Sequence, residues 1–281
     1  MKIVFFGYDF SADVLKRLVE DGHETLSVFS FETDNVFSFN ARLEELAKEL
    51  GVSFELAPVT PEQVEDLLSL GAQCFISAGY PSKIPPIDKS RAYGMNLHPT
   101  LLPEGRGFMP MPRLIMEHPD ACGMTIHKLA QEYDRGDILY QEAIKMLPDE
   151  DIETLSARMV MRAPHIVSEV VSDIQNLWKN AKPQTKKGSW WNAVPESART
   201  FDWTKTAAQT DKMIRAFSRY GMLADFDGRR WSVFQAKSWQ ENHDFRPGDI
   251  ACCLSREVVL AIADGFVILK EFYPLEQEKR A

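Results

Sequence analysis

The stretch KIVFFGYDFSADVLKRLVEDG (residues 2–22) contains the two patterns that decide the fold. Residues 2–7 form a short, continuous apolar run, which is typical of a strand buried on both faces of a parallel sheet. The residues that follow have apolar side chains at helical spacing between a capping serine, Ser11, and a terminating glycine, Gly22. One strand followed at once by one helix predicts the first unit of an α/β domain.

The same alternation continues to residue 80. We expect further strands at 25–31, 53–59 and 73–80 and helices at 40–51 and 60–71, the last with a capping box of Thr60 and Gln63. Strands alternating with helices of this size predict right-handed βαβ units, and therefore a Rossmann-like, mainly parallel sheet with helices on both faces. Later strands are expected at 94–99, 122–129 and 138–146, a short helix at 111–117, and a helix over 151–178 that Pro164 kinks or splits.

The remaining residues predict a second, smaller domain. Residues 179–189 are polar with four lysines, so we place a linker at 179–202 between a catalytic domain, 1–178, and a C-terminal domain, 203–281. That last part has a helical pattern followed by short strands with Asp-Gly turn pairs, which indicate hairpins. Short strands of this kind are typical of a small β-barrel, here an OB-like one.

Composition excludes several functional classes. The chain has 281 residues, of which 44% are hydrophobic and 26% charged, as in ordinary globular proteins. No apolar run approaches the roughly 18 residues of a membrane-spanning helix, and the N-terminus lacks the apolar core of a signal peptide. Four cysteines without metal-binding spacing predict free thiols in a reducing cytoplasm. A net charge of −9 weakly disfavours a nucleic-acid partner, because a polyanion needs clustered lysines and arginines. Together with the thiols and the lack of a long apolar run, this predicts a cytoplasmic protein without a membrane or nucleic-acid partner.

Candidate catalytic residues lie in GMNLHPTLLPEGRG (94–107). Asn96, His98 and Thr100 occupy every second position, so along a strand they point to one side, at the carboxyl end where parallel sheets bind ligands. Asp134 follows in a tight loop and can orient and stabilise a protonated histidine. An amide that donates to an oxyanion, an imidazole and a carboxylate, with no serine or cysteine nucleophile beside them, suit direct acyl transfer to an amine.

Two motifs carry a resemblance to a known family. MNLHPTLLPEGRG (95–107) and GMTIHKLAQEYDRGDIL (123–139) resemble the paired signatures of the 10-formyltetrahydrofolate-dependent formyltransferases, in the same order and strand context. FDWTKTAAQTDKMIRAF (201–217) is similar to the helix after the linker in the branches that carry a C-terminal barrel. The resemblance therefore spans nearly the whole chain.

The resemblance implies a formyltransferase with 10-formyltetrahydrofolate as co-substrate and no metal. Asn96, His98 and Asp134 match the catalytic residues of the family. The residues implied to line the folate pocket are Ala78, Gly79, Tyr80, Lys83, Ile84, Tyr133, Gly136 and Asp137. Those implied on the acceptor side are Thr100, Arg106, Gly107 and Phe108, although GRGFMPMPR (105–113) departs from the signature. His127 is interpreted as a buried structural histidine and the pair Trp190–Trp191 as packing of the linker.

The identity of the acceptor stays open among several readings. A nucleotide-linked amino sugar is the leading one, because the segment 31–42, basic in the tRNA branch, has Arg42 as its single basic residue here. Methionyl-tRNA and an amino-acid-type amine are the alternatives within the family. A hydrolase that releases formate from the folate and a non-enzymatic binding module are the other readings, and a homodimer is left open.

Overall fold

The computed structural model describes residues 1–35 and 38–275, which form two compact units. The α/β unit comprises Met1–Pro110, Asp120–Lys145 and Ser156–Trp191; the C-terminal unit comprises Met111–Pro119, Met146–Leu155 and Asn192–Ala281. Residues 36–37 of the segment 31–42 and residues 276–281 of the predicted C-terminal domain lie outside the described residues. The domain boundaries at 178 and 203 stay a prediction.

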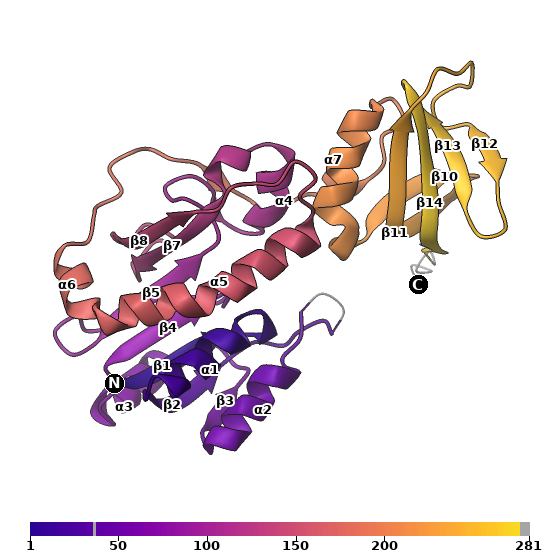
Figure 1. The fold of residues 1–281 in the computed structure, drawn as a ribbon. Coiled ribbons are helices and arrows are strands. Elements are labelled where there is room, and N and C mark those ends of the chain that lie inside the picture. Colours follow the sequence, from indigo (N-terminus) through magenta and orange to yellow (C-terminus); the bar gives the residue numbers. More distant parts are fainter. Residues whose placement is uncertain (36–37, 276–281) are drawn as a thin grey trace. The chain divides into compact units, whose positions relative to one another are not determined.

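A seven-stranded sheet is the centre of the α/β unit (Figure 1). Its order is β3-β2-β1-β4-β5-β7-β8. The bounds are β1 Lys2–Gly7, β2 Glu24–Phe29, β3 Ser53–Glu55, β4 Cys74–Ala78, β5 Tyr93–His98, β7 Gly123–Lys128 and β8 Ile138–Ala143. Neighbours from β3 to β5 pair in parallel, whereas β5–β7 and β7–β8 are antiparallel. The predicted mainly parallel sheet is confirmed.

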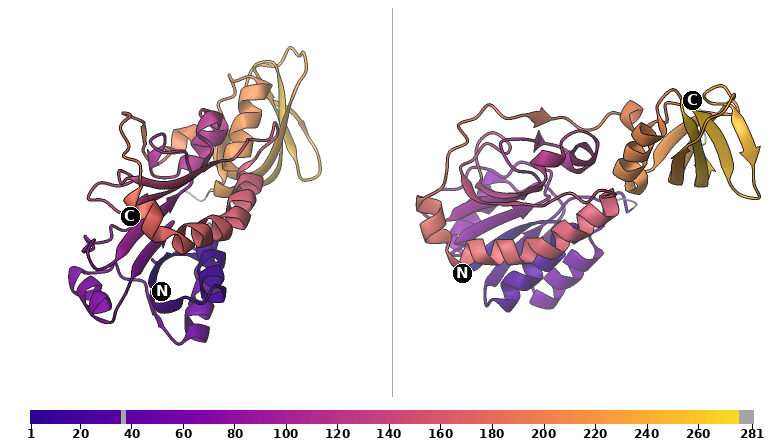
Figure 2. Two further views of the ribbon diagram at one scale, coloured as in Figure 1. Left: turned by 60° about the vertical axis from the view of Figure 1, so that its left-hand side comes forward. Right: turned by 45° about the horizontal axis from the view of Figure 1, so that its top comes forward.

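Helices cover both faces of this sheet (Figures 1 and 2). Their bounds are α1 Ala12–Glu20, α2 Ala41–Leu50, α3 Pro61–Ser69, α5 Ile152–Ser172 and α6 Ile174–Lys179, with 3₁₀ turns η1 Asp9–Ser11 and η2 Pro119–Ala121. Strand order runs outward from β1 to β3 and then returns to β4 on the other side of β1. Because crossovers are right-handed, this reversal places α3 on the face opposite to α1 and α2.

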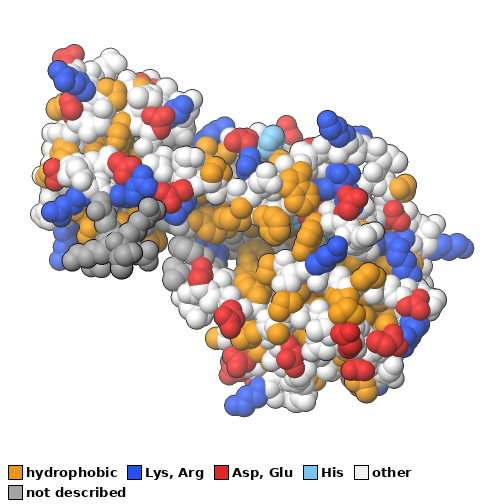
Figure 3. Space-filling view, turned by 180° about the vertical axis from the view of Figure 1, so that it is seen from behind, with side chains coloured by type: hydrophobic (Ala, Val, Ile, Leu, Met, Phe, Trp, Pro, Cys, Tyr) orange, Lys and Arg blue, Asp and Glu red, His pale blue; other side chains and the backbone are white. Residues whose placement is uncertain are grey.

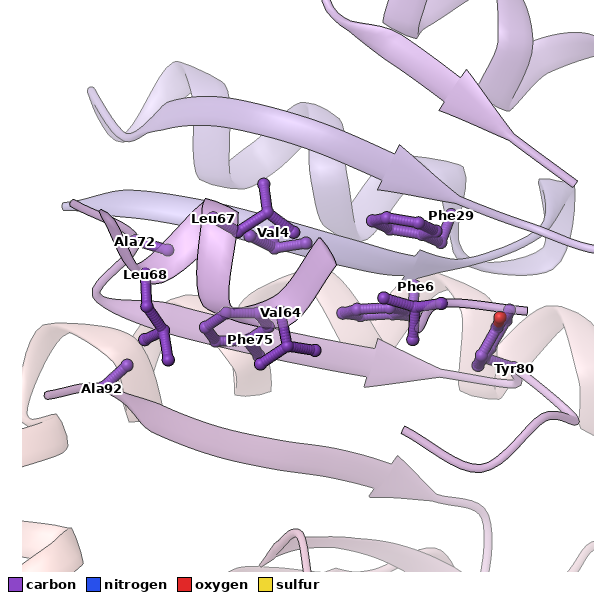
Figure 4. Packing of buried hydrophobic residues seen from close by; sticks show 11 residues of the cluster. Val4, Phe6, Phe29, Val64, Leu67, Leu68, Ala72, Phe75, Tyr80 and Ala92 are labelled. Carbon is purple, nitrogen blue, oxygen red and sulfur yellow. The ribbon is translucent and has the colours of Figure 1, made fainter. Parts of the chain in front are cut away.

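The core beneath α3 shows how the apolar runs become strands. Val4 and Phe6 of β1 point to this face and pack with Phe29, Phe75 and the α3 side chains Val64, Leu67 and Leu68 (Figure 4). Their neighbours Ile3 and Phe5 are equally buried, which requires a covered opposite face. A run without polar alternation is therefore compatible only with a central strand.

Of the two N-caps predicted from the sequence, one is confirmed and the other is wrong. The Thr60 capping box is confirmed, because Thr60 Oγ1 accepts from the Gln63 amide and Gln63 Oε1 accepts from the Thr60 amide. Ser11 does sit at the N-cap of α1, but the predicted side-chain cap is wrong. Its hydroxyl donates to the carbonyl of Tyr8, at 3.0 Å, because η1 already turns the chain there.

Of the two predicted effects of Pro164 on the long helix, the split does not occur, and the kink stays a prediction. α5 continues through Pro164 to Ser172, and the helix is interrupted at Asp173, which is the N-cap residue of α6. A proline removes one helical hydrogen bond. The side chains that follow it, including Ile166, Val167 and Val170, are fully buried, and their packing holds the helix together across that position.

The C-terminal unit contains an antiparallel sheet of order β10-β11-β14-β13-β12. The strands are β10 Met222–Phe226, β11 Arg229–Gln240, β12 Ile250–Cys253, β13 Val258–Ile262 and β14 Gly265–Pro274; the helical elements are α4 Pro110–Met116, η3 Glu196–Arg199, α7 Ala207–Phe217 and η4 Ser218–Tyr220. Both predicted Asp-Gly turns join antiparallel neighbours. The antiparallel C-terminal sheet is confirmed, and its closure into a barrel stays a prediction. No helix in the part of the chain that the structure describes is long and apolar enough to cross a membrane.

The first half of the predicted linker, up to Trp191, belongs to the compact α/β unit. Lys182 exchanges two backbone hydrogen bonds with Ile138, and β9 (Trp190–Trp191) pairs in parallel with β6 (Arg106–Gly107). The indole of Trp191 is only 5% exposed. We name residues 182–191 the strap. Most of its side chains are polar, but its backbone forms hydrogen bonds with β6 and β8, which are distant in sequence.

Candidate active site

The carboxyl end of β5 presents the predicted amide and imidazole. Asn96 and His98 are two residues apart on the strand, so both point to the same side of the sheet. His98 is buried and Asn96 is partly exposed. Thr100, expected to continue this row towards the acceptor, is fully buried, and its hydroxyl donates to the carbonyl of Glu104. The expectation that Thr100 faces the acceptor is therefore wrong, and Thr100 instead shapes the turn. The reason is that β5 ends at His98, so side chains beyond it no longer alternate between the two sides of the sheet.

Asp134 folds back over this strand end from the loop between β7 and β8. Its backbone has φ +55°, a left-handed conformation that few non-glycine residues adopt. One carboxylate oxygen, Oδ2, accepts from the amide of Gly107 at 2.9 Å. The other, Oδ1, lies 3.6 Å from His98 Nδ1 and 3.5 Å from Asn96 Nδ2. The structure thus brings the three predicted catalytic residues together.

The hydrogen bonds of His98 determine which nitrogen can take a proton. Nε2 lies 2.8 Å from the carbonyl oxygen of Gly105, which can only accept, so Nε2 carries hydrogen and donates. In the neutral ring, Nδ1 is then the basic nitrogen, and it faces the carboxylate of Asp134. A proton arriving at Nδ1 would form an imidazolium directly beside that negative charge.

Electrostatics favour an ionised Asp134 and a neutral His98 before reaction. Burial lowers the pKa of His98 below its ordinary value, and the attraction of Asp134 only partly offsets this. For Asp134, burial by itself raises the pKa, but the contacts with His127 and His98 and the Gly107 amide lower it to about 2. A neutral base next to a carboxylate is the state needed to accept a proton.

His127 belongs to the same cluster, which the sequence interpretation missed. It lies opposite Asn96 in the β5–β7 ladder. Its Nδ1 is 2.9 Å from the carbonyl of Lys128, and its Nε2 is 3.2 Å from Asn96 Nδ2 and 3.4 Å from Asp134 Oδ1. His127 is buried and hydrogen-bonded as expected, but its partners are the catalytic candidates. Its place in the second motif, seven residues before Asp134, was the available signal.

Arg106, expected on the acceptor side, is a buried side chain that anchors the strap. Its side chain is 2% exposed. Nε and Nη2 donate to Gln184 Oε1 at 3.0 and 2.7 Å, and Nη1 donates to the carbonyl of Lys187 at 2.9 Å. The guanidinium faces the strap because the parallel pairing of β6 with β9 covers it, so it is not presented to a diphosphate.

The predicted folate-side residues fall on two segments. Ala78 ends β4 next to Leu97 of β5, and Gly79 follows it with φ +78°. Tyr80 is buried with its ring 5.3 Å from that of Phe6, Ile84 packs on the same core, and Lys83 is exposed. In the second segment, Gly136 lies against the Lys128 backbone, and Asp137 pairs with Lys128 Nζ at 3.2 Å.

Exposed aromatic rings border the loop between β7 and β8, residues 129–137, which carries Asp134 and is called the catalytic loop below. Phe108 follows Gly107 and is 44% exposed; Tyr133 precedes Asp134 and is 40% exposed. Their ring centroids are 6.0 Å apart, and the ring of Trp190 lies 6.4 Å from that of Phe108, edge to face. Trp190 is therefore a surface ring beside the site, while Trp191 does the packing that was expected of both.

Chemically, the cluster can bind a carbonyl, polarise it and move one proton. Asn96 supplies amide N–H donors for a developing oxyanion, and His98 supplies a basic nitrogen backed by a carboxylate. Such a set can transfer an acyl group directly to an incoming nucleophile.

Comparisons with known proteins agree with this chemistry. A model of the formyl transferase family matches residues 1–171, and one of the formyl transferase C-terminal domain matches residues 194–279. Methionyl-tRNA formyltransferase of Streptococcus pneumoniae (strain Hungary19A-6) is 28% identical over 297 residues, which covers 99% of this chain and 92% of the relative.

Solved structures share the fold at lower identity. WlaRD, a sugar 3N-formyl transferase crystallised in the presence of dTDP and 5-N-formyl-THF, has a TM-score of 0.67 at 16% identity, covering 99% of this chain and 98% of that one. The N-formyltransferase of Helicobacter canadensis, in complex with folinic acid and dTDP-3-aminofucose, has a TM-score of 0.67 at 15% identity, covering 97% and 99%. HypX of Aquifex aeolicus with tetrahydrofolic acid reaches 0.69 at 20% identity, and this chain spans only 45% of it.

These structural likenesses establish the fold, and the family follows from the sequence match. The model matched over residues 1–171 covers more than half of the chain, and the second model covers most of the remainder. The chain therefore belongs to the formyl transferase family and is a formyltransferase.

Proposed function

We propose that the protein transfers the formyl group of 10-formyltetrahydrofolate to the amine of a nucleotide-linked amino sugar. The observation that carries this proposal is the convergence of Asn96, His98 and Asp134 in one buried cluster bordered by exposed aromatic rings. The complexes of HypX with tetrahydrofolic acid and of the Helicobacter enzyme with folinic acid, and the WlaRD structure determined in the presence of 5-N-formyl-THF, support the donor. The segments 78–84 and 133–137 are where we place it.

The reaction uses the cluster in a defined order. The amine nitrogen attacks the formyl carbon, and the carbonyl π electrons move to oxygen, where the Asn96 amide donates to the oxyanion. His98 Nδ1 accepts the proton released from the amine, and Asp134 stabilises the resulting imidazolium. The bond to N10 then breaks, the carbonyl reforms, and the proton passes from His98 to the departing tetrahydrofolate nitrogen.

Three observations favour a small acceptor over a tRNA. The net charge is −9, and Arg42, the basic residue of the segment 31–42, is paired with Asp13 at 2.7 Å. On the face of the protein shown in Figure 3, lysines and arginines are interspersed with acidic side chains. A tRNA needs several phosphate contacts, whereas a nucleotide sugar needs one or two cations and an aromatic ring for its base. Phe108 and Tyr133 are candidates for the ring. Arg135 is a candidate cation: it is half-exposed, and its ion pair with Glu132 is solvent-exposed and longer, at 3.4 Å, than that of Arg42 with Asp13.

Methionyl-tRNA remains the second candidate, because a methionyl-tRNA formyltransferase aligns over 99% of this chain. An amino-acid-type amine is the third. A panel assay separates them: dTDP- and UDP-linked amino sugars, charged initiator tRNA and free amino acids are each incubated with the enzyme and 10-formyltetrahydrofolate. Formylation of a nucleotide sugar with kcat/KM at least tenfold above the other acceptors is the expected result. Efficient tRNA formylation without sugar turnover would overturn the proposal.

A further inference from the structure

The strap contacts the catalytic loop through the amide side chain of Gln184. Gln184 Nε2 donates to the carbonyl of Asp134 at 2.9 Å and to that of Gly136 at 2.8 Å. Its oxygen accepts both hydrogen bonds from Arg106 described above, and Arg106 Nε also donates to the carbonyl of Asp134, at 3.3 Å. One glutamine therefore links the catalytic loop and the buried arginine.

The backbone of Asp134 needs such support. A non-glycine residue in the left-handed region is strained and persists only where its surroundings hold it. Here the carbonyl is held by two donors, Gln184 and Arg106. The same strap also fixes the other end of the residue, because β9 pairs with β6 and thereby positions the Gly107 amide that binds the Asp134 carboxylate.

We infer that Gln184 is a positioning residue for formyl transfer, which holds Asp134 in the orientation that faces His98. It acts through Asp134 and does not touch the reacting atoms. The inference rests on the role given to Asp134 above. It goes beyond the motifs, because Gln184 lies 50 residues from Asp134 in a polar stretch with no motif of its own.

Two substitutions separate positioning from folding. Gln184→Met removes the amide donors and also the acceptor of Arg106. Gln184→Glu keeps an acceptor for Arg106, which preserves the buried arginine, but loses the donors to the carbonyls of Asp134 and Gly136. The control is Gln63→Met, which removes the side-chain acceptor of the exposed capping box of α3, keeps the backbone bond from Gln63 to Thr60 Oγ1, and leaves the site untouched.

The first readout is independent of the acceptor. Proton NMR follows the titration of His98, assigned against His98→Asn, in the wild type and in Gln184→Met. The groups that face His98 are Asp134 and His127. Since Asp134 raises the pKa of His98, its displacement should lower that pKa further. An unchanged His98 titration in a folded Gln184→Met protein would overturn the inference, whatever the acceptor is.

The second readout is turnover with the acceptor found in the panel. We expect kcat to fall roughly ten- to a hundredfold in both variants, with KM changed less, because misplacement of a catalytic group by about 1 Å has effects of this size. Gln184→Glu should keep a melting temperature near that of the wild type, so it reports positioning even if Gln184→Met does not fold. Wild-type kcat in Gln184→Glu would contradict the inference. Gln63→Met should lose stability only.

Discussion

At the scale of residues, the site is a set of ordinary side chains whose burial and partners give them their chemistry. Asn96 and His98 lie on one side of β5. One carboxylate oxygen of Asp134 accepts from the Gly107 amide, and the other faces the imidazole of His98. The carbonyl of Gly105 selects the tautomer of His98 that leaves its basic nitrogen facing Asp134. Each contact constrains the next, so the residues should act as one unit.

Removing any one of the three should abolish most turnover. We expect His98→Ala, Asn96→Ala and Asp134→Ala each to lower kcat about a hundredfold or more, which is the usual size for an oxyanion donor or a proton-transfer group. The double variants should lose less than the product of the single losses. Steady-state kinetics on proteins shown to be folded by circular dichroism checks this, with Cys252→Ser as an exposed control. Near wild-type turnover in His98→Ala would refute the assignment.

The pH dependence of the rate should report His98. Its pKa in the free enzyme is lowered, so the acid limb of the kcat/KM profile should lie below about 6.5, the ordinary histidine value. In Asp134→Asn, the attraction that raises this pKa is lost, so the limb should move to still lower pH while the plateau falls. A limb that stays in place in Asp134→Asn would show that another group controls it.

The same shift makes a prediction for stability. Between the folded pKa of His98 and about 6.5, the unfolded chain binds more protons than the folded one, so stability rises with pH through that window and is lost on acidification. Asp134, whose pKa falls from 3.8 to about 2, contributes stability that is lost at lower pH, between those two values. Urea unfolding at pH 5 to 7 should show a steeper acid loss for the wild type than for His98→Asn.

At the scale of elements, the site depends on three segments that the chain places far apart. The end of β5 supplies the amide and imidazole, the loop after β7 supplies the carboxylate, and the strap supports that loop from the side. The loop is tightly fitted: a Cβ added to Gly136 would lie 1.7 Å from the carbonyl oxygen of Lys128. Only a backbone shift could relieve such a contact.

Gly136→Ala should therefore lower activity by moving the loop that carries Asp134. We expect kcat to fall at least about tenfold, since displacing a catalytic group has effects of that size. The matched control is Gly228→Ala in the β10–β11 turn, where φ is +68° but nothing lies within 4 Å of the added Cβ. It should lose about 1 kcal/mol of stability and keep its kcat. Equal kcat values for the two variants would argue against a tight loop.

At the scale of the whole molecule, charge bears on the acceptor. Acidic residues outnumber basic ones by 41 to 32 over the complete chain, which disfavours a long polyanion. We expect kcat/KM for the preferred acceptor to change by less than roughly tenfold between about 50 and 200 mM salt, since few phosphates are contacted. A salt dependence of several orders of magnitude would instead indicate tRNA.

Arg135→Gln should raise KM for a nucleotide sugar with kcat nearly unchanged.

The sequence by itself determined the α/β fold and the paired motifs, and it singled out the three candidate catalytic residues Asn96, His98 and Asp134. These rest on local information: unbroken apolar runs for central strands, a capping box at Thr60, and period-two spacing that puts Asn96 and His98 on one side. Such patterns involve residues that are close in sequence, so contacts with distant segments do not change them.

Tertiary structure alone decided the surroundings of that trio. It buried Arg106 under the strap, brought His127 against Asn96, and kept α5 whole across Pro164. None of these depends on nearby sequence, because each is fixed by what packs or pairs against the residue from a distant segment. A polar glutamine in a lysine-rich stretch gives no local sign of its partners, so the contact of Gln184 with the backbone of Asp134 is visible only once the chain has folded.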